Sequence, residues 1–134
     1  MQSKFSLNYP GGPVISSSLT PGELAVIPGV KERDMYNGWT WYDLPETEIQ
    51  GKRAIIRLAF YKEQLSRIDV SLTDPSRYGS TWENWSESGE RLRAEDTAQW
   101  LASLGYGPGE YVWGDVWRGY DSKGGQGYAR ICFR

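Results

Sequence analysis

The stretch RAIIRLAFYKEQLSRIDVSLT, residues 53–73, decides the fold of this chain. Apolar residues occupy every second position in both of its halves, and neighbouring side chains of a β-strand point to opposite faces. The alternation therefore predicts two strands, 53–61 and 65–73, that each bury one face and form a hairpin. The inward-facing residues are Ile56, Leu58 and Phe60 in the first strand and Ile68, Val70 and Leu72 in the second.

Further strands are predicted on both sides of this hairpin. An Asn-Gly turn signal opens residues 37–44, and Pro45 either makes this segment an edge strand or ends it. The apolar run 24–27 predicts a strand or a helical turn, and residues 10–23, rich in Pro, Gly and Ser, predict a loop. The other predicted strands are 4–9, 111–118 and 127–133.

One long helix is predicted from about residue 81 to residue 104. Ser80 and Glu83 have the spacing of a capping box, and Gly105 suits the C-terminal cap. Gly89 weakens a helix by about 1 kcal/mol relative to Ala, so a break at 86–89 is an alternative. Apart from a gap in the middle, the apolar residues recur at three- and four-residue intervals: Trp82, Trp85, Leu92, Leu101 and Leu104. The charged residues are expected on a solvated outer face: Glu90, Arg91, Arg93, Glu95 and Asp96.

This order of strands, one helix and more strands predicts a single α+β domain over residues 1–134. The short connections favour an antiparallel, meander-like sheet of about five to seven strands, covered on one face by the helix. A chain of this length buries enough surface to fold alone. The pattern leaves the oligomeric state open.

The composition argues against several function classes. The net charge is −2 with no strongly basic stretch, so we expect no nucleic-acid partner. Histidine is absent and Cys132 is the single cysteine, which removes the usual Ser-His-Asp and Cys-His machinery and any plausible structural zinc site. We expect no cofactor, no metal and no enzyme activity, with Cys132 as a buried, inert thiol.

No segment has the apolar run of a signal peptide or membrane helix, so we expect a soluble, cytoplasmic protein without membrane contacts.

The C-terminal stretch GYDSKGGQGYARICFR, residues 119–134, contains a loop that has some features of a phosphate or metal site. The order of Lys123 and the following glycines does not match a phosphate-binding loop, and a strand rather than a helix follows. Asp121 is the only carboxylate there, which is too few for calcium. We therefore expect a hairpin connection, and a recognition role for Tyr120, Asp121 and Lys123 is the alternative.

The tryptophans are candidates for either the core or a binding surface. Trp113 and Trp117 lie four residues apart in a predicted strand and should face the same way. We expect them to pack under the helix, with an aromatic platform for a sugar or a partner as the alternative. The expected packing partners are Trp82, Trp85 and Trp100.

The segment NGWTWYDLPETE, residues 37–48, is the strongest candidate for partner binding. It combines a predicted edge strand with Trp and Tyr, which are enriched among binding hot spots, and with carboxylates suited to a basic partner. Core packing beside a solvated acidic loop is the alternative. The candidate partner-binding residues are Trp39, Trp41, Tyr42, Asp43, Glu46 and Glu48, together with Tyr120 and Asp121 of the C-terminal loop.

Two further functions remain open from the sequence. Exposed Trp and Tyr would suit a small-ligand or carbohydrate-binding module with a concave pocket. Paired carboxylates would suit a hydrolase if two of them faced one cleft. The nearest pairs along the chain are Asp43 with Glu46 and Glu83 with Glu87.

The chain resembles the small immunity proteins that bacteria make against secreted or contact-delivered toxins. The likeness lies in size, mild acidity, missing catalytic groups and one helix over an antiparallel sheet. It implies a cytoplasmic protein that binds and blocks a cognate toxin, and it assigns no residue roles. The stretches that resemble segments of small bacterial families are SLTPGE (18–23), WENWSESGE (82–90) and VWGDVWRGYDSKGG (112–125).

Overall fold

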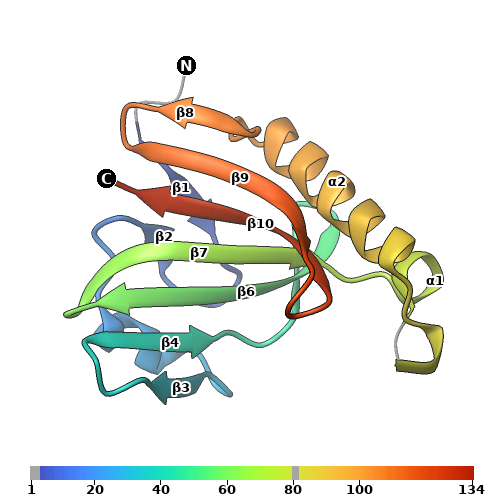
Figure 1. Cartoon of the computed structure of the whole chain (residues 1–134). Helices are drawn as coiled ribbons and strands as arrows, with labels where there is room; N and C mark the ends of the chain where they lie inside the picture. Colours follow the sequence, from blue (N-terminus) through green and yellow to red (C-terminus); the bar gives the residue numbers. More distant parts are fainter. Residues whose placement is uncertain (1–3, 80–81) are drawn as a thin grey trace.

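The computed structural model describes residues 4–79 and 82–134, and these form an α+β domain (Figure 1). A small sheet pairs β1 with β2, and a large antiparallel sheet holds the other eight strands. The small sheet is β1 (Ser6–Asn8) and β2 (Val14–Ser16). The large sheet is β3 (Lys31–Asp34), β4 (Trp39–Asp43), β5 (Thr47–Ile49), β6 (Lys52–Tyr61), β7 (Gln64–Leu72), β8 (Gly109–Tyr111), β9 (Gly114–Asp121) and β10 (Gln126–Phe133). The helices are the 3-10 helices η1 (Pro21–Val26) and η2 (Trp82–Asn84) and the α-helices α1 (Pro75–Tyr78) and α2 (Glu87–Ser103).

The predicted hairpin is confirmed and lies at the centre of the large sheet. β6 and β7 pair so that Ile56 lies opposite Val70 and Leu58 lies opposite Ile68. All four side chains are at most 1% exposed, as their alternation predicts. The predicted strands near the N-terminus, at residues 37–44 and at the C-terminus are also present, and with them the predicted α+β class.

The strand order differs from a simple meander. It runs β3-β4-β6-β7-β10-β9-β8, with β5 pairing β6 beyond the end of β4. The chain leaves β7, passes through α1 and α2, enters the sheet at its far edge as β8 and returns inward to β10. The ten strands in the described part of the chain exceed the predicted five to seven, because four strands had no alternating apolar signal and were missed. β3 is fully charged, and β2, β5 and β8 have three residues each, with β2 inside the predicted loop 10–23.

The inner face of the sheet is covered by two layers of different origin. Helix α2 packs against β7, β9 and β10, while β1, β2 and η1 supply further core side chains; Figure 1 shows β1 and β2 behind the sheet. The expectation of one helix covering the face is therefore incomplete. The N-terminal segment contributes Phe5, Leu7, Ile15, Leu19 and Leu24 to the core.

Helix α2 begins later than predicted and buries a different stripe. It starts at Glu87, because Ser86 caps it by accepting a hydrogen bond from the Gly89 amide at 3.0 Å. The predicted cap at Ser80 lies outside the described residues. Leu92 on the predicted apolar stripe is exposed, whereas Glu90 on the predicted solvated face is buried. The small buried residues, Ala94, Thr97 and Ala98, let the helix lie close to the sheet. The other buried residues of the helix are Glu90, Trp100 and Leu101.

The prediction that Trp113 and Trp117 share a face under the helix is wrong. Trp113 precedes β9 and packs on Phe5 and Tyr111, while Trp117 stands on the opposite face of the sheet and is 46% exposed. Gly114, between the two tryptophans, begins β9. Its backbone lies so close to β10 that a Cβ there would overlap the Cys132 carbonyl oxygen. A glycine in a strand is typical of such a close approach between backbones.

Candidate functional site

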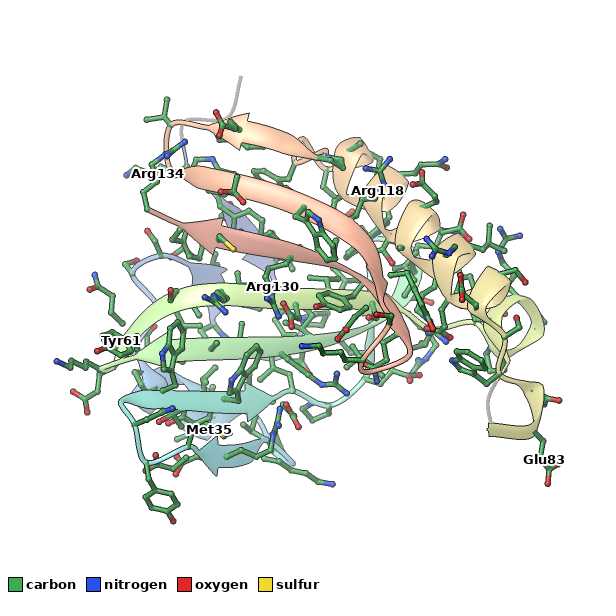
Figure 2. All side chains as sticks on the ribbon, in the orientation of Figure 1. Met35, Tyr61, Glu83, Arg118, Arg130 and Arg134 are labelled. Carbon is green, nitrogen blue, oxygen red and sulfur yellow. The ribbon has the colours of Figure 1, made fainter. Side chains whose placement is uncertain are left out.

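The outer face of the large sheet, here called the open face, carries charged and aromatic side chains (Figure 2). Residues directly opposite each other on paired strands share a face, so the strand registers define its rows. One row alternates in charge across the sheet and is called the charge ladder: Lys31, Asp43, Arg57, Asp69 and Arg130, followed by Trp117. The neighbouring row is Arg33, Trp41, Ala59, Arg67, Cys132 and Asp115.

Ion pairs neutralise most carboxylates of these rows. Asp43 Oδ1 lies 2.9 Å from Arg33 and 3.7 Å from Arg57. Both oxygens of Asp69 accept hydrogen bonds from Arg130, at 2.7 and 3.0 Å, and the ion pair places the pKa of Arg130 well above its ordinary value. The two neighbours of Arg57 in the charge ladder, Asp43 and Asp69, therefore each have a closer arginine partner. Arg57 donates no hydrogen bond to any residue that the structure describes.

Aromatic side chains flank the ladder and hold the arginines in place. The Arg67 guanidinium lies 4.9 Å from the Trp39 ring, and Trp39 packs on Tyr61 at 5.1 Å. On the other flank Trp117 meets Tyr128 edge to face at 5.5 Å. Cation–π contacts and aromatic pairs of this kind keep large side chains ordered while leaving part of each ring exposed.

The open face brings together only some of the predicted partner-binding residues. Trp39, Trp41 and Asp43 project from β4 onto it, and Asp121 reaches it from the end of β9. Tyr42 and Tyr120 project to the other side of their strands, since they alternate with these residues.

The two tyrosines on the inner side have structural contacts. Tyr42 meets Phe60 edge to face at 5.4 Å, and burial, followed by the nearby Glu32 carboxylate, raises its pKa to about 12. Tyr120 packs under Arg91 of α2 at 4.9 Å. These contacts place both rings beside the helix and core layers rather than with Trp39 and Trp41.

The prediction that residues 37–44 form an edge strand is wrong, because β3 pairs with the outer side of β4. The expected acidic patch also has a different character. Asp43 is paired with arginines, Glu46 lies 2.8 Å from Arg53, and Glu48 lies opposite Arg53 in the β5–β6 ladder. Glu46 and Glu48 therefore stand at the end of the sheet, beyond β4, and not beside the two tryptophans.

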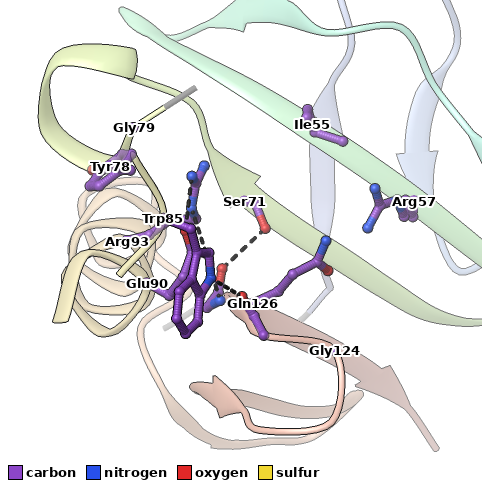
Figure 3. Close-up of a pocket in the computed structure, with 12 residues that line it drawn as sticks. Ile55, Arg57, Ser71, Tyr78, Gly79, Trp85, Glu90, Arg93, Gly124 and Gln126 are labelled. Carbon is purple, nitrogen blue, oxygen red and sulfur yellow. Dashed lines mark hydrogen bonds and ion pairs between the residues drawn. The ribbon is translucent and has the colours of Figure 1, made fainter. Parts of the chain in front are cut away.

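A hollow opens beside the charge ladder where β6 and β7 meet the β9–β10 hairpin, and it is called the Arg57 hollow (Figure 3). Its volume is about 330 Å³, and a smaller hollow of about 200 Å³ adjoins it toward Trp41 and Tyr128. Both share Ile55, Arg57, Ser71 and Gln126. The other lining residues of the Arg57 hollow are Tyr78, Gly79, Trp85, Glu90, Arg93, Gly124, Gly125 and Gly127.

The C-terminal loop is a hairpin connection and also a wall of this hollow. Asp121 Oδ1 accepts a hydrogen bond from the Lys123 amide at 3.0 Å, and Gly125 has φ +66°, so the turn uses the residues expected of it. The Trp85 indole donates a hydrogen bond to the Gly125 carbonyl at 2.8 Å. That contact fixes the loop against the segment preceding α2.

A buried ion pair forms the floor of the Arg57 hollow. Glu90 accepts hydrogen bonds from Arg93 at 3.0 Å and from the Gly127 amide at 3.0 Å, and Arg93 donates to the Leu72 carbonyl. These bonds tie α2 to the end of β7 and the start of β10. Sequence reasoning missed this role because Glu90 and Arg93 fall among solvated charges of the same helix.

The carboxylate pairs nearest in sequence do not line either hollow. Glu87 forms an exposed ion pair with Arg91, and Glu83 is exposed. Cys132, expected to be buried, is half-buried on the open face, and burial followed by Asp115 raises its pKa. In the part of the chain that the structure describes, no group of three His, Cys, Asp or Glu is placed to hold a metal ion.

Comparisons with known proteins give no relative. No family model, no curated protein and no solved structure matches this chain. Among the described residues, no helix has the length and apolar character to cross a membrane.

Proposed function

We propose that this chain is a non-catalytic binding protein that blocks a protein toxin by docking on it through the open face. The observation that supports this is the residue composition of that face. Trp, Tyr and Arg are the residue types most enriched among binding hot spots, and the open face concentrates them. The anchors are Trp39, Trp41, Trp117, Arg67 and Tyr61.

The packing of these anchors also favours docking. Arg67 rests on Trp39 and Trp39 on Tyr61, on strands held by neighbours on both sides. Side chains that are already ordered lose little conformational entropy when a partner covers them, which leaves more of the contact energy for affinity. A partner seated on this face would have its own surface covered, so the mechanism of inhibition is steric.

The ion pairs of the face determine which partner suits it. Asp43 on this face, and Glu46 at the end of the sheet, already have arginine partners at 2.9 and 2.8 Å, so they contribute to specificity more than to attraction of a basic protein. The proposed partner therefore presents an apolar centre with charges of both signs around it. A docked complex of this kind buries roughly 1,200–2,000 Å² in total.

Affinity capture tests this proposal. The tagged protein is incubated at low salt with the native cytoplasm and culture supernatant, and bound proteins are identified by mass spectrometry. We expect one stoichiometric partner that the double variant Trp39→Ala, Trp117→Ala loses and that Leu92→Ala, on the exposed side of α2, retains. Absence of a stoichiometric partner rejects the inhibitor function. Equal capture by the double variant rejects the open face as the docking surface.

A further inference from the structure

We propose that the Arg57 hollow binds a small ligand that carries a carboxylate or phosphate group on a flat ring. The site does not depend on the docking function, and its test needs no partner protein. The hollow is concave and about 330 Å³ in volume, which is within the usual size of small-ligand sites. Its walls come from β6, β7, the β9–β10 hairpin and the segment preceding α2.

Arg57 is the group that would hold the anion. Its nearest carboxylate, Asp43, lies 3.7 Å away and is engaged more closely by Arg33 at 2.9 Å. Both oxygens of Asp69, the other neighbour of Arg57 in the charge ladder, accept hydrogen bonds from Arg130. A guanidinium fork with free donors at the edge of a concave site matches a carboxylate or phosphate in two-pronged geometry.

The charge of the hollow agrees with this assignment. Among the residues that the structure describes, its lining contains two guanidinium groups, Arg57 and Arg93, and one carboxylate, Glu90. Glu90 and Arg93 lie 3.0 Å apart and cancel each other, so the remaining charge of the lining is that of Arg57, which Asp43 offsets only in part because Arg33 binds that carboxylate more closely. A neutral acceptor gains only a hydrogen bond from that charge, whereas an anion also gains charge–charge attraction in a partly enclosed site.

The remaining walls suit a flat ring with polar edges. Figure 3 shows Arg57 and Ile55 on one side of the hollow and Trp85 on the other. Indole and aliphatic surfaces bury the faces of a ring, and the Gln126 amide can bond to groups on its rim. The Ser71 hydroxyl donates to the Gly127 carbonyl at 3.3 Å and can accept a further hydrogen bond from such a group. The floor is fixed by the hydrogen bonds of Glu90, so these walls are held in place before a ligand arrives.

The experiment is a titration of the labelled protein followed by side-chain NMR. Benzoate and phenyl phosphate are the probes, and benzyl alcohol is the neutral control at the same concentrations. We expect both anions to move the Arg57 Nε–H and Trp85 indole N–H resonances, and benzyl alcohol to leave them in place. Equal shifts with benzyl alcohol, or no shift with any probe, would overturn the proposal.

Two matched variants identify the residue that holds the anion. Arg57→Gln should weaken benzoate binding by at least about tenfold, read from the Trp85 indole, because a charge-assisted hydrogen bond is lost. Arg118→Gln, at an exposed arginine outside both the hollow and the open face, should bind as the wild type. Both sites are at the surface, so unchanged urea midpoints will show that the fold is intact. Wild-type affinity in Arg57→Gln contradicts the assignment.

A further probe distinguishes two sources of the carboxylate. The capped dipeptide acetyl-Phe-Glu-amide presents the same group as a docked protein chain would. A stronger response to the dipeptide than to benzoate assigns the carboxylate to a peptide ligand, and the reverse assigns it to a free ring acid. Both results require Arg57, so the variants above remain the decisive test.

Discussion

The covered face and the open face of the large sheet are built from the same strands but have opposite physical characters. On β7, Ile68 is completely buried in the core, whereas the next residue, Asp69, is held by Arg130 on the outside. The covered face gains stability from removing apolar surface from water. The open face consists of polar and aromatic groups that neutralise one another and stay accessible. Substitutions should therefore separate stability from binding according to the face that they alter.

The largest difference in stability is expected between substitutions of two neighbouring residues on β6. Leu58→Ala removes a fully buried side chain and should lower the free energy of unfolding by about 2–5 kcal/mol. Arg57→Ala, one residue earlier and on the open face, should change it by less than about 0.5 kcal/mol. Urea unfolding of both variants measures the difference. A loss of similar size at the two positions would show that the open face is not the accessible surface described above.

The next prediction concerns the point where helix α2 touches the sheet. A Cβ on Gly127 would overlap the Glu90 carbonyl oxygen, so Gly127→Ala must push α2 away from β10. Overpacking of this kind should cost about 3 kcal/mol and also loosen the floor of the Arg57 hollow.

Gly22→Ala is the matched control for this variant, because a Cβ added there would meet no distant part of the described chain within 4 Å and its backbone needs no positive φ. It should be neutral or slightly stabilising. Thermal unfolding measures both variants. A Gly127→Ala protein as stable as Gly22→Ala would contradict the close contact between helix and sheet.

The fold could be predicted where burial leaves a periodic trace in the sequence. The alternation in 53–73 identified the central hairpin because one face of each strand is buried and the other is not. β3 had no such trace, since both of its faces are exposed and all four residues are charged. Helix α2 begins later than predicted because Ser86 supplies its cap. Its buried stripe was only partly predicted because Ala94, Thr97 and Ala98, which carry little apolar signal, lie on it beside Trp100 and Leu101.

The site could be predicted only in part, because it depends on pairing between distant strands. Trp39, Trp41 and Asp43 were found as a group since they alternate on one strand. Arg57 was placed on an outward face, but its position between Asp43 and Asp69 requires the strand registers. The order of β9 and β10 brought Trp117 to the same surface, and no local pattern specifies that order.

A smaller effect is expected at Tyr78, which joins α1 to α2 beneath the edge of the Arg57 hollow. Its hydroxyl donates a hydrogen bond to Asp96 at 2.6 Å, and burial, followed by this carboxylate, raises its pKa to about 12. The folded state thus holds the proton more tightly than the unfolded state, whose value is near 10. This contribution is present below pH 10 and is lost as the pH rises from about 10 to 12.

Tyr78→Phe tests that pH dependence. The variant should be about 1 kcal/mol less stable than the wild type at pH 8, because Asp96 keeps Arg77 but loses the hydroxyl. The gap should narrow toward pH 11, since phenylalanine does not titrate. Urea unfolding across pH 8–11 measures it, and Tyr36→Phe, at a hydroxyl that is exposed to solvent, is the control. A constant gap over this range would contradict the raised pKa.

The smallest effect on stability is expected for Arg33→Gln. This variant distinguishes the two faces because it should weaken ligand binding on the open face without changing the stability that the covered face provides. The Arg33–Asp43 pair is 50% and 28% exposed, so its loss should lower the free energy of unfolding by at most about 0.5 kcal/mol. The variant leaves Asp43 without its closer partner, so its present ion pair with Arg57, at 3.7 Å, can shorten to hydrogen-bond distance. Pairing of Arg57 with Asp43 would neutralise the charge proposed to hold an anion, so benzoate binding should weaken while the fold is unchanged. Binding and unfolding measured on the same sample test both statements; wild-type benzoate affinity in Arg33→Gln would mean that Asp43 does not compete for Arg57.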